Sequence, residues 1–312
     1  MRKYLLPKDG IFYKANLHCH STHSDGKLTV EQLKEVYKKE GYSVVAFSDH
    51  NVLIPHMDLC DEEFLPITSI EIDVSDNTVP WPKNATYHIN FFSKDPYADK
   101  FIELERIYNA DVINDIIRRA KERGFIAQYN HPRWSLQTAC DFLPLEGLFA
   151  FEVYNTGCEV DMMNGWGEYE YETYVMSGKR CGCVATDDNH NSQELKSPKS
   201  DSFKGFTMIK AKELSYDSVM NALEDLDFYA STGPVIHELY VEDNTVYIET
   251  SPCSCILLRT DSRISKSTRE ESDVLTKHAF SLDFNYEYIR FECSDIFGNK
   301  ALTRAYFKDE IQ

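Results

Sequence analysis

The amino-acid sequence predicts an α/β fold followed by a small all-β domain. Between about residue 14 and about residue 230, strand-like apolar runs alternate with helix-like segments, a pattern typical of parallel sheets and α/β barrels. After the STGPVI stretch at 231–236, helical periodicity stops, and short alternating segments follow, joined by turn residues. We therefore expect an α/β domain over residues 1–231 and a β-sandwich-like domain over residues 232–312.

The individual elements follow from the same patterns. Strands are expected near 14–19, 43–48, 65–70, 86–92, 125–129, 148–154, 180–186 and 205–210. Thr29–Glu40 opens with a capping threonine and carries apolar residues at helical spacing, which predicts a helix. A longer helix is predicted over Asp99–Arg123, ended by Gly124, and a short one over Tyr216–Leu226. The polar stretch Asn189–Phe203 is expected to form a loop.

The composition is typical of a globular cytoplasmic protein. A chain of 312 residues with 42% hydrophobic and 13% aromatic side chains can bury a sizeable core. No apolar run approaches the roughly 20 residues that a membrane helix needs, and the opening MRKYLLPKDG is too short in apolar residues for a secretory signal. Nine cysteines without a CxxC pair predict reduced, mostly structural thiols.

The strongly acidic charge argues against a long nucleic acid as a partner. The chain has 51 acidic and 33 basic residues, which gives a formal net charge of −18. Such a field repels a long polyanion, whereas nucleic-acid-binding proteins usually present basic patches. A small anionic substrate remains compatible, because bound cations can make one pocket locally positive.

Two histidines at the end of the first long apolar run are the strongest chemical signal. His18 and His20 are one residue apart in KANLHCHSTHSDG, and alternation along a strand places their side chains on the same face. Taken alone, the pair is also compatible with two polar residues on a solvated strand face. Similar residues, however, follow later strand-like runs.

These residues are all of metal-binding types. They are Asp25 in SDG, His50 in SDH, Glu71 in SIE, His88 in YHIN, His131 in NHP, and Asp188 with His190 in DNH. In an α/β barrel the loops that follow the strands gather at one rim, so residues at strand ends converge there. His88 lies inside its strand but shares a face with Thr86 and Asn90, so it can also point inward.

The size of this set predicts more than one ion. Six histidines and three carboxylates exceed what one ion uses, since zinc takes about four ligands and manganese or iron about six. We therefore expect two or three divalent ions, with zinc, manganese and iron all compatible with these ligands. Such ions lower the pKa of bound water towards about 7 and neutralise charge on a phosphate, the two functions that hydrolysis of a phosphate ester requires.

These residues resemble the PHP (polymerase and histidinol phosphatase) superfamily of metal-dependent phosphoesterases. The resemblance covers roughly residues 14–230 and rests on HCHSTHSDG, FSDHN, the Glu of SIEI, NHP, and the Asp and His of DDNH. It implies a distorted (β/α)7 barrel with up to three ions. It also implies how the ions would share their ligands: His18, His20, Glu71 and Asp188 for one, Glu71, His88 and His131 for a second, and Asp25, His50 and His190 for a third. The small β domain also resembles one that follows this barrel in some bacterial members.

We therefore expect hydrolysis of a small phosphate ester, either a phosphomonoester or a small nucleotide. Metal-activated hydroxide at a dinuclear or trinuclear site would attack the phosphorus, with Glu71, His131 and Asp188 as the catalytic residues. One alternative is an amidohydrolase-type hydrolase of a non-phosphate substrate. Another is a noncatalytic, metal-stabilised binding module.

Two ligand choices rest on spacing. Asp187 and Asp188 are adjacent, and we choose Asp188 because D-x-H with His190 follows the family pattern. His23 precedes Asp25 by two residues, where some relatives use histidine, and Asp25 is our choice.

Further residues are expected around the ligands. Arg133, next to the NHP motif, could bind a substrate phosphate through its planar guanidinium, or form a surface ion pair. Glu152 and Asn155 end another strand and could orient the ligands or have only a structural role. Trp134 and Trp81 could line the pocket or pack in the core.

Overall fold

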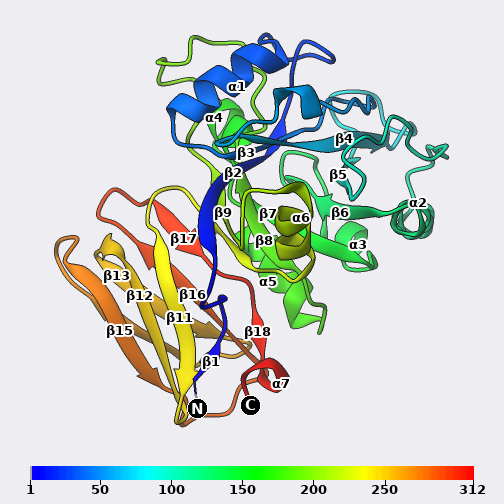
Figure 1. Ribbon diagram of the computed structural model, residues 1–312. Helices are drawn as coiled ribbons and strands as arrows, with labels where there is room; N and C mark the ends of the chain where they lie inside the picture. The colour runs from blue at the N-terminus through cyan, green and yellow to red at the C-terminus, as the bar shows by residue number, and fades with distance from the viewer. Residues whose placement is uncertain (1) are drawn as a thin grey trace.

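A computed structural model describes residues 2–312, which form an α/β region and a β-rich region (Figure 1). The core of the α/β region is a series of neighbouring strands in chain order. They are β2 (Ile11–Cys19), β3 (Val44–Phe47), β4 (Leu65–Ser75), β5 (Thr86–Ser93), β6 (Phe125–Tyr129), β7 (Leu148–Asn155) and β8 (Gly182–Thr186). The mixed α/β fold is therefore as predicted.

The same sheet continues on the other side of β2 into the C-terminal part of the chain. Its further strands are β9 (Phe206–Ala211), β10 (Phe228–Ser231), β17 (Lys300–Leu302), β16 (Tyr288–Ser294), β13 (Cys255–Thr260) and β14 (Ser265–Arg269), with β18 (Tyr306–Phe307) beside β16. β8 and β9 are joined through a side chain, because Thr207 Oγ1 bonds both the amide and the carbonyl of Ala185. A closed ring of barrel strands stays a prediction.

The strand directions are mixed rather than all parallel. β2, β3 and β4 are parallel, and so are β6, β7 and β8, whereas β5 is antiparallel to both of its neighbours. Only residues 76–85 connect β4 to β5, and a parallel crossover needs a dozen or more residues. β5 therefore returns as a hairpin, which brings His88 to the cluster from inside a strand.

Helices cover the outside of the α/β region. They are α1 (Val30–Lys39), the short 3₁₀ helix η1 (Met57–Leu59), α2 (Ala110–Glu122), α3 (Ala139–Phe142), α4 (Thr156–Met162), α5 (Glu168–Met176) and α6 (Tyr216–Glu224). The predicted helices at α1 and α6 are confirmed. Thr29 caps α1 by accepting from the Gln32 amide, as in a capping box.

The long helix predicted over residues 99–123 is wrong in its first half. α2 begins only at Ala110, because the Asn109 side chain accepts a hydrogen bond from the Asp111 amide and caps the helix there. Its end is as predicted, since Gly124 follows with a left-handed φ of 83°. The preceding segment packs aromatic side chains on the core, with Phe101 against Phe91.

The β-rich region has a second sheet that faces the C-terminal part of the first. Its strands are β1 (Lys3–Tyr4), β11 (Ile236–Glu242), β12 (Thr245–Cys253) and β15 (Leu275–Ser281), and α7 (Lys308–Ile311) closes the chain. A buried apolar cluster lies between the two sheets, including Leu239, Ile248 and Phe291. Two pairings cross the expected boundary at 231/232: β1 joins β11, and β17 joins β10.

Among residues 2–312, none of the helices has both the length and the apolar character of a transmembrane segment.

Candidate metal centre

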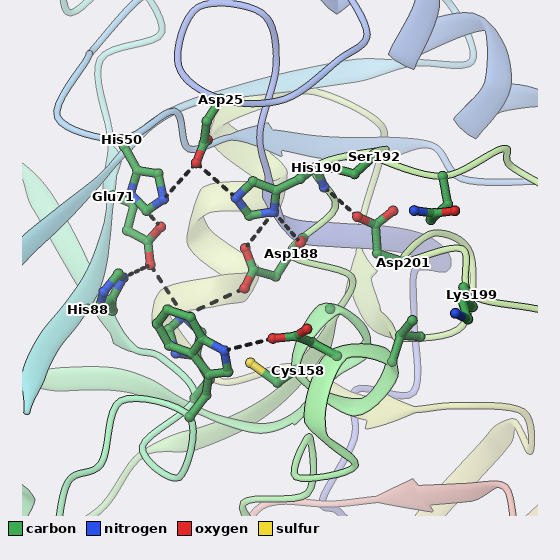
Figure 2. A pocket seen from close by; sticks show the side chains of 16 residues that line it. Asp25, His50, Glu71, His88, Cys158, Asp188, His190, Ser192, Lys199 and Asp201 are labelled. Carbon is green, nitrogen blue, oxygen red and sulfur yellow. Dashed lines mark hydrogen bonds and ion pairs between the residues drawn. The ribbon is translucent and has the colours of Figure 1, made fainter. Parts of the chain in front are cut away.

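All nine predicted side chains meet in one cluster. His18 is the penultimate residue of β2. The other ligand-type residues come from segments that follow β2, β3, β6 and β8, except Glu71 in β4 and His88 in β5. Each histidine has a ring nitrogen within 4.0 Å of a carboxylate oxygen of Asp25, Glu71 or Asp188. Residues that are far apart in the sequence thus form one continuous polar site (Figure 2).

Glu71 lies at the centre of this cluster and is fully buried. Its Oε2 atom lies 3.2 Å from His18 Nε2, 3.3 Å from His20 Nε2 and 3.1 Å from His50 Nδ1, and its Oε1 atom lies 3.0 Å from His88 Nδ1 and 3.6 Å from His131 Nε2. The amide of Asn130 also donates to Oε1, at 2.9 Å. Ring nitrogens therefore lie close to both oxygens of this one carboxylate.

Asp188 is the second shared carboxylate. Its Oδ1 atom lies 3.1 Å from His18 Nε2 and 3.0 Å from His20 Nε2, and its Oδ2 atom lies 3.6 Å from His131 Nε2. His18, His20, Glu71 and Asp188 together form a buried group that could hold a metal ion.

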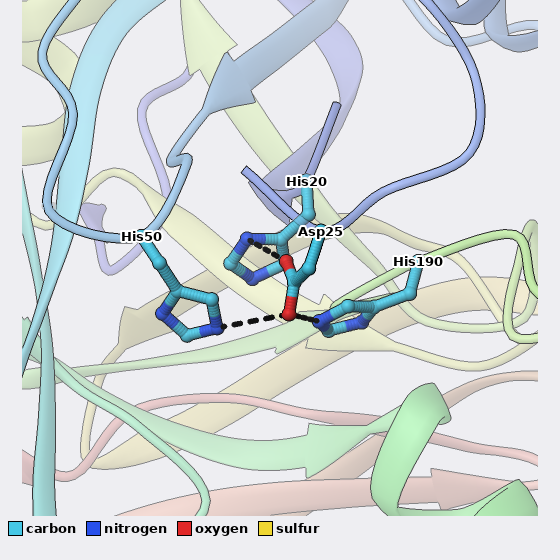
Figure 3. Close-up of side chains that lie close together, drawn as sticks. All are labelled: His20, Asp25, His50 and His190. Carbon is cyan, nitrogen blue, oxygen red and sulfur yellow. Dashed lines mark ion pairs between the residues drawn. The ribbon is translucent and has the colours of Figure 1, made fainter. Parts of the chain in front are cut away.

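A more exposed group lies at the mouth of the site (Figure 3). Asp25 Oδ2 lies 3.3 Å from His190 Nε2 and 3.8 Å from His50 Nε2, and Asp25 Oδ1 lies 3.9 Å from His20 Nδ1. These four residues form a second group that could hold an ion, and His50, Glu71 and His88 form a third. His20, His50 and Glu71 each belong to two groups, as expected of neighbouring sites that share ligands.

The polar atoms of the buried group fit a cation better than they fit one another. His18 Nε2, both ring nitrogens of His20, and Glu71 Oε2 are buried without a hydrogen-bond partner. Two ligand atoms that each lie about 2.1 Å from one ion are about 3 Å apart at a right angle. The observed separations of 3.0–3.3 Å match this value.

Hydrogen bonds on the outer ring nitrogens fix which atoms face the cluster. His18 Nδ1 lies 3.0 Å from Glu152 Oε1, and His190 Nδ1 lies 3.0 Å from the carbonyl oxygen of Asp188. Both partners are acceptors, so in the neutral form of each ring, the form that binds a metal, Nδ1 carries the proton and Nε2 presents its lone pair to the carboxylates. A lone pair facing carboxylate oxygens is repulsive unless a cation lies between them.

The charges within the cluster also favour a bound cation. Burial alone lowers the pKa of His20, but the nearby carboxylates of Asp188 and Glu71 raise it to about 9. Burial alone raises the pKa of Glu71, but the charges of His18 and other histidines hold it well below its usual range. The buried carboxylates thus stay ionised and attract positive charge.

Glu152 contacts residues of the cluster from behind, which agrees with one of the two roles that the sequence left open for it. It is 1% exposed; its Oε1 atom also accepts from the Thr186 hydroxyl, and its Oε2 atom accepts from the His131 amide at 2.8 Å and from Asn155 Nδ2 at 3.0 Å. Asn155 also donates to Asp188 Oδ2 at 3.0 Å. One buried carboxylate therefore connects ligands from three strand ends.

The two adjacent aspartates have different surroundings. Asp188 faces the cluster, whereas Asp187 accepts hydrogen bonds from the Tyr37 and Thr156 hydroxyls and from backbone amides at 203–205. Asp187 therefore anchors the far end of the loop that begins at Asn189. Similarly, Asp25 reaches the cluster, while the His23 ring stacks on His56 with ring centroids 5.3 Å apart.

A cavity of about 510 Å³ opens in front of the cluster. Besides cluster residues, its lining includes Trp134, Cys158, Asp161, Ser192, Lys199 and Asp201. The sequence did not single out the last five, because residues of a polar loop or a short helix carry no periodic signal. Trp134 is in the wall, whereas Trp81 is 75% exposed and is not part of the lining.

Arg133 is directed elsewhere. Its Nε atom donates to Glu170 Oε1 at 2.9 Å, and the residue is not part of the cavity lining. The surface ion pair considered from the sequence is present, and a role of Arg133 in substrate binding stays a prediction.

Comparison with known proteins identifies the family. A family model for the PHP domain matches residues 16–255, well over half of the chain. The chain belongs to the PHP domain family. No curated protein gives a significant match.

Two solved structures resemble this PHP protein. One is a two-domain protein from Bacteroides vulgatus, described as containing a predicted PHP-like metal-dependent phosphoesterase; the match has 15% identity and a TM-score of 0.52 and covers 97% of this chain and 98% of that one. The other is from Bifidobacterium adolescentis and is named as a candidate metal-dependent phosphoesterase, with 16% identity, a TM-score of 0.36 and coverage of 59% and 89%. The first shows that the two-region fold is shared along the whole chain.

Proposed function

We propose that this PHP-family protein hydrolyses a small phosphate ester with the help of two or three divalent metal ions. The observation that carries the proposal is the convergence of nine histidine and carboxylate side chains, with buried ligand atoms left unpaired, at the base of an open cavity. Zinc, manganese and iron all suit a mixed imidazole and carboxylate site.

The donor groups suggest how the ions are held. His18, His20, Glu71 and Asp188 would hold one, Asp25, His50 and His190 with His20 a second, and His88 and His131 around Glu71 a third. Bound ions of this kind supply a nucleophilic water of lowered pKa and neutralise charge on the phosphate.

The chain's own residues would organise the reaction around this chemistry. Glu71, His131 and Asp188 belong to the cluster and also line the cavity, so they would hold the ions next to a substrate phosphate. Trp134 lies edge-on to the rings of His88 and His131, with centroids 5.7 and 5.4 Å away, and shields them from water on that side. No serine or cysteine nucleophile is needed.

The test combines metal analysis of the purified protein with a hydrolysis screen in added zinc, manganese or iron. The screen contains phosphate esters and amides. We expect bound metal and turnover of phosphate esters, and Glu71→Gln should lower the metal content and abolish turnover. Glu63→Gln, on a side chain that is 80% exposed and far from the cavity lining, is the matched control.

Other outcomes would change the assignment. Turnover of amides alone would favour a carbon–nitrogen hydrolase. Bound metal without turnover of any ester would favour a binding module, and full activity of Glu71→Gln would contradict the proposed site.

A further inference from the structure

Lys199 is the one lysine or arginine among the residues that line the cavity. Figure 2 shows it on the opposite side of the cavity from His88 and Glu71. Across residues 2–312, no ion pair or hydrogen bond involves its ammonium group, although the chain carries a large excess of carboxylates. Lys199 is exposed and lines the cavity, so its unpaired ammonium is available to a ligand.

The carboxylates near Lys199 are engaged elsewhere or lie apart from it. Asp201 is two residues away and also lines the cavity, but its Oδ2 atom accepts from the amides of His190 and Asn191 at 2.8 and 3.0 Å. Asp161, which also lines the cavity, accepts a long bond of 3.5 Å from the Trp134 indole. The negative charges of Asp161 and Asp201 disfavour an anionic group of a ligand in the middle of the cavity. Outside the cluster, the favourable position for such a group is therefore at Lys199.

The segment that carries Lys199 is tied to the cluster at both ends. Asp201 bonds to the backbone of the ligand-bearing turn at His190, and Asp187 holds the amides at 203–205. Ser200, next to Lys199, is buried, and its amide donates to the carbonyl of Ser197 at 2.9 Å. The backbone that carries Lys199 is therefore held relative to the cluster by hydrogen bonds, and its exposed side chain reaches the cavity from there.

The cavity is also too large for a phosphate alone. Its volume of about 510 Å³ is in the range of pockets that enclose a whole small organic molecule. If the ester phosphate lies at the cluster, the cavity leaves room for the rest of the substrate to extend towards Lys199 on the opposite side.

We propose that Lys199 is a specificity-determining residue that binds a second anionic group of the substrate. The inference rests on the proposed phosphoesterase function and narrows its substrate class: a phosphate ester whose alcohol portion carries a carboxylate or a second phosphate at the end remote from the bond that is cleaved. A charge-assisted hydrogen bond from Lys199 to that group should raise kcat/KM for such esters about tenfold above that for neutral ones.

The experiment compares matched esters that differ only at the remote end. A rigid pair is 4-carboxyphenyl phosphate and 4-carbamoylphenyl phosphate, and a flexible pair is 6-phosphooxyhexanoate and its amide. Hexane-1,6-diyl bisphosphate tests a second phosphate against the carboxylate. The readout is the ratio of kcat/KM for the anionic ester to kcat/KM for its neutral partner, measured with the metal-loaded full chain.

We expect a ratio of about ten or more for at least one pair, falling about tenfold in Lys199→Gln and recovering in part in Lys199→Arg. Lys196→Gln is the matched control, because Lys196 is an exposed lysine of the same loop that does not line the cavity. It removes the same charge from the protein, and its ratio should equal that of the wild type.

The failures are distinguishable. Equal turnover of anionic and neutral esters, or an equal fall of the ratio in Lys196→Gln, would overturn the role of Lys199 while leaving a phosphoesterase. Absence of turnover for every ester would overturn the proposed function itself.

Discussion

Glu152 provides a sharp test of how the cluster is held, because it touches two ligands without facing the cavity. Replacing it by glutamine keeps the shape but turns one acceptor oxygen into a donor. At the Oε2 position a donor would face two other donors, the amide of His131 and Asn155 Nδ2. The new amide group must therefore point towards His18 and Thr186.

That orientation changes the imidazole of His18. The Thr186 hydroxyl can rotate to accept, but His18 Nδ1 must also become an acceptor, so the ring proton moves to Nε2. Nε2 lies 3.2 Å from Glu71 and 3.1 Å from Asp188, where an ion would be held. Metal binding must then reverse the tautomer and lose a charge-assisted bond, which is worth about 1.5–3 kcal/mol.

This loss corresponds to about a 10- to 100-fold weaker metal affinity. The assay is titration of the metal-free Glu152→Gln protein with zinc and, separately, with manganese, followed by calorimetry or competition with a chelator. Glu146→Gln, on an exposed side chain paired with Lys179, is the control. An affinity within twofold of the wild type for both metals would refute the reasoning about the His18 tautomer.

Three further predictions concern the turn, the pH response and the contact between regions. Gly26→Ala should reduce the number of ions bound at the mouth of the site by metal analysis, because the added Cβ would lie 2.5 Å from the backbone oxygen of His20 and displace the turn. Burial, reinforced by a nearby carboxylate, raises the pKa of Asp227 to about 6. The unfolded chain ionises near pH 4, so stability falls as the pH rises from about 4 through 6; Asp227→Asn should raise Tm at pH 7.5, with a smaller gain at pH 4.5. Glu172→Ala should lower the free energy of unfolding by about 3 kcal/mol in denaturant titrations, because it leaves the guanidinium of Arg290, 2% exposed, without its carboxylate.

Each of these has an outcome that would contradict it. An unchanged metal stoichiometry and affinity in Gly26→Ala would contradict the prediction for the turn at Gly26. For the pH response, it is a gain in Tm that is as large at pH 4.5 as at pH 7.5. For the contact between α5 and β16, it is a loss below about 1 kcal/mol, which would show that Arg290 finds another partner or water.

Local sequence patterns were sufficient to predict which side chains form the cluster. The strand period of two places His18 and His20 on one face, and both are fully buried within the cluster. Residues at the ends of parallel strands converge for a topological reason, which is why His50, His131 and Asp188 could be expected at one site. These signals depend on local spacing and on the rule for parallel strands, so one sequence can carry them.

Tertiary packing decided the features that depend on partners distant in the chain. The sequence left two roles open for Glu152, and its bond to His18, 134 positions away, depends on how β2 and β7 approach each other. The place of Lys199 opposite the cluster depends on Asp187 and Asp201, which fold an otherwise unpatterned loop back onto the strands.

The sequence by itself thus determined the types of ligand, the strands that carry them and the α/β class of the fold. The tertiary structure decided the antiparallel course of β5, the start of α2 at Ala110 and the pairing of β1 with β11. Periodicity reports which face of an element is buried, whereas the length of a connection, a competing side-chain cap and a strand partner found hundreds of residues later are settled only when the chain is packed.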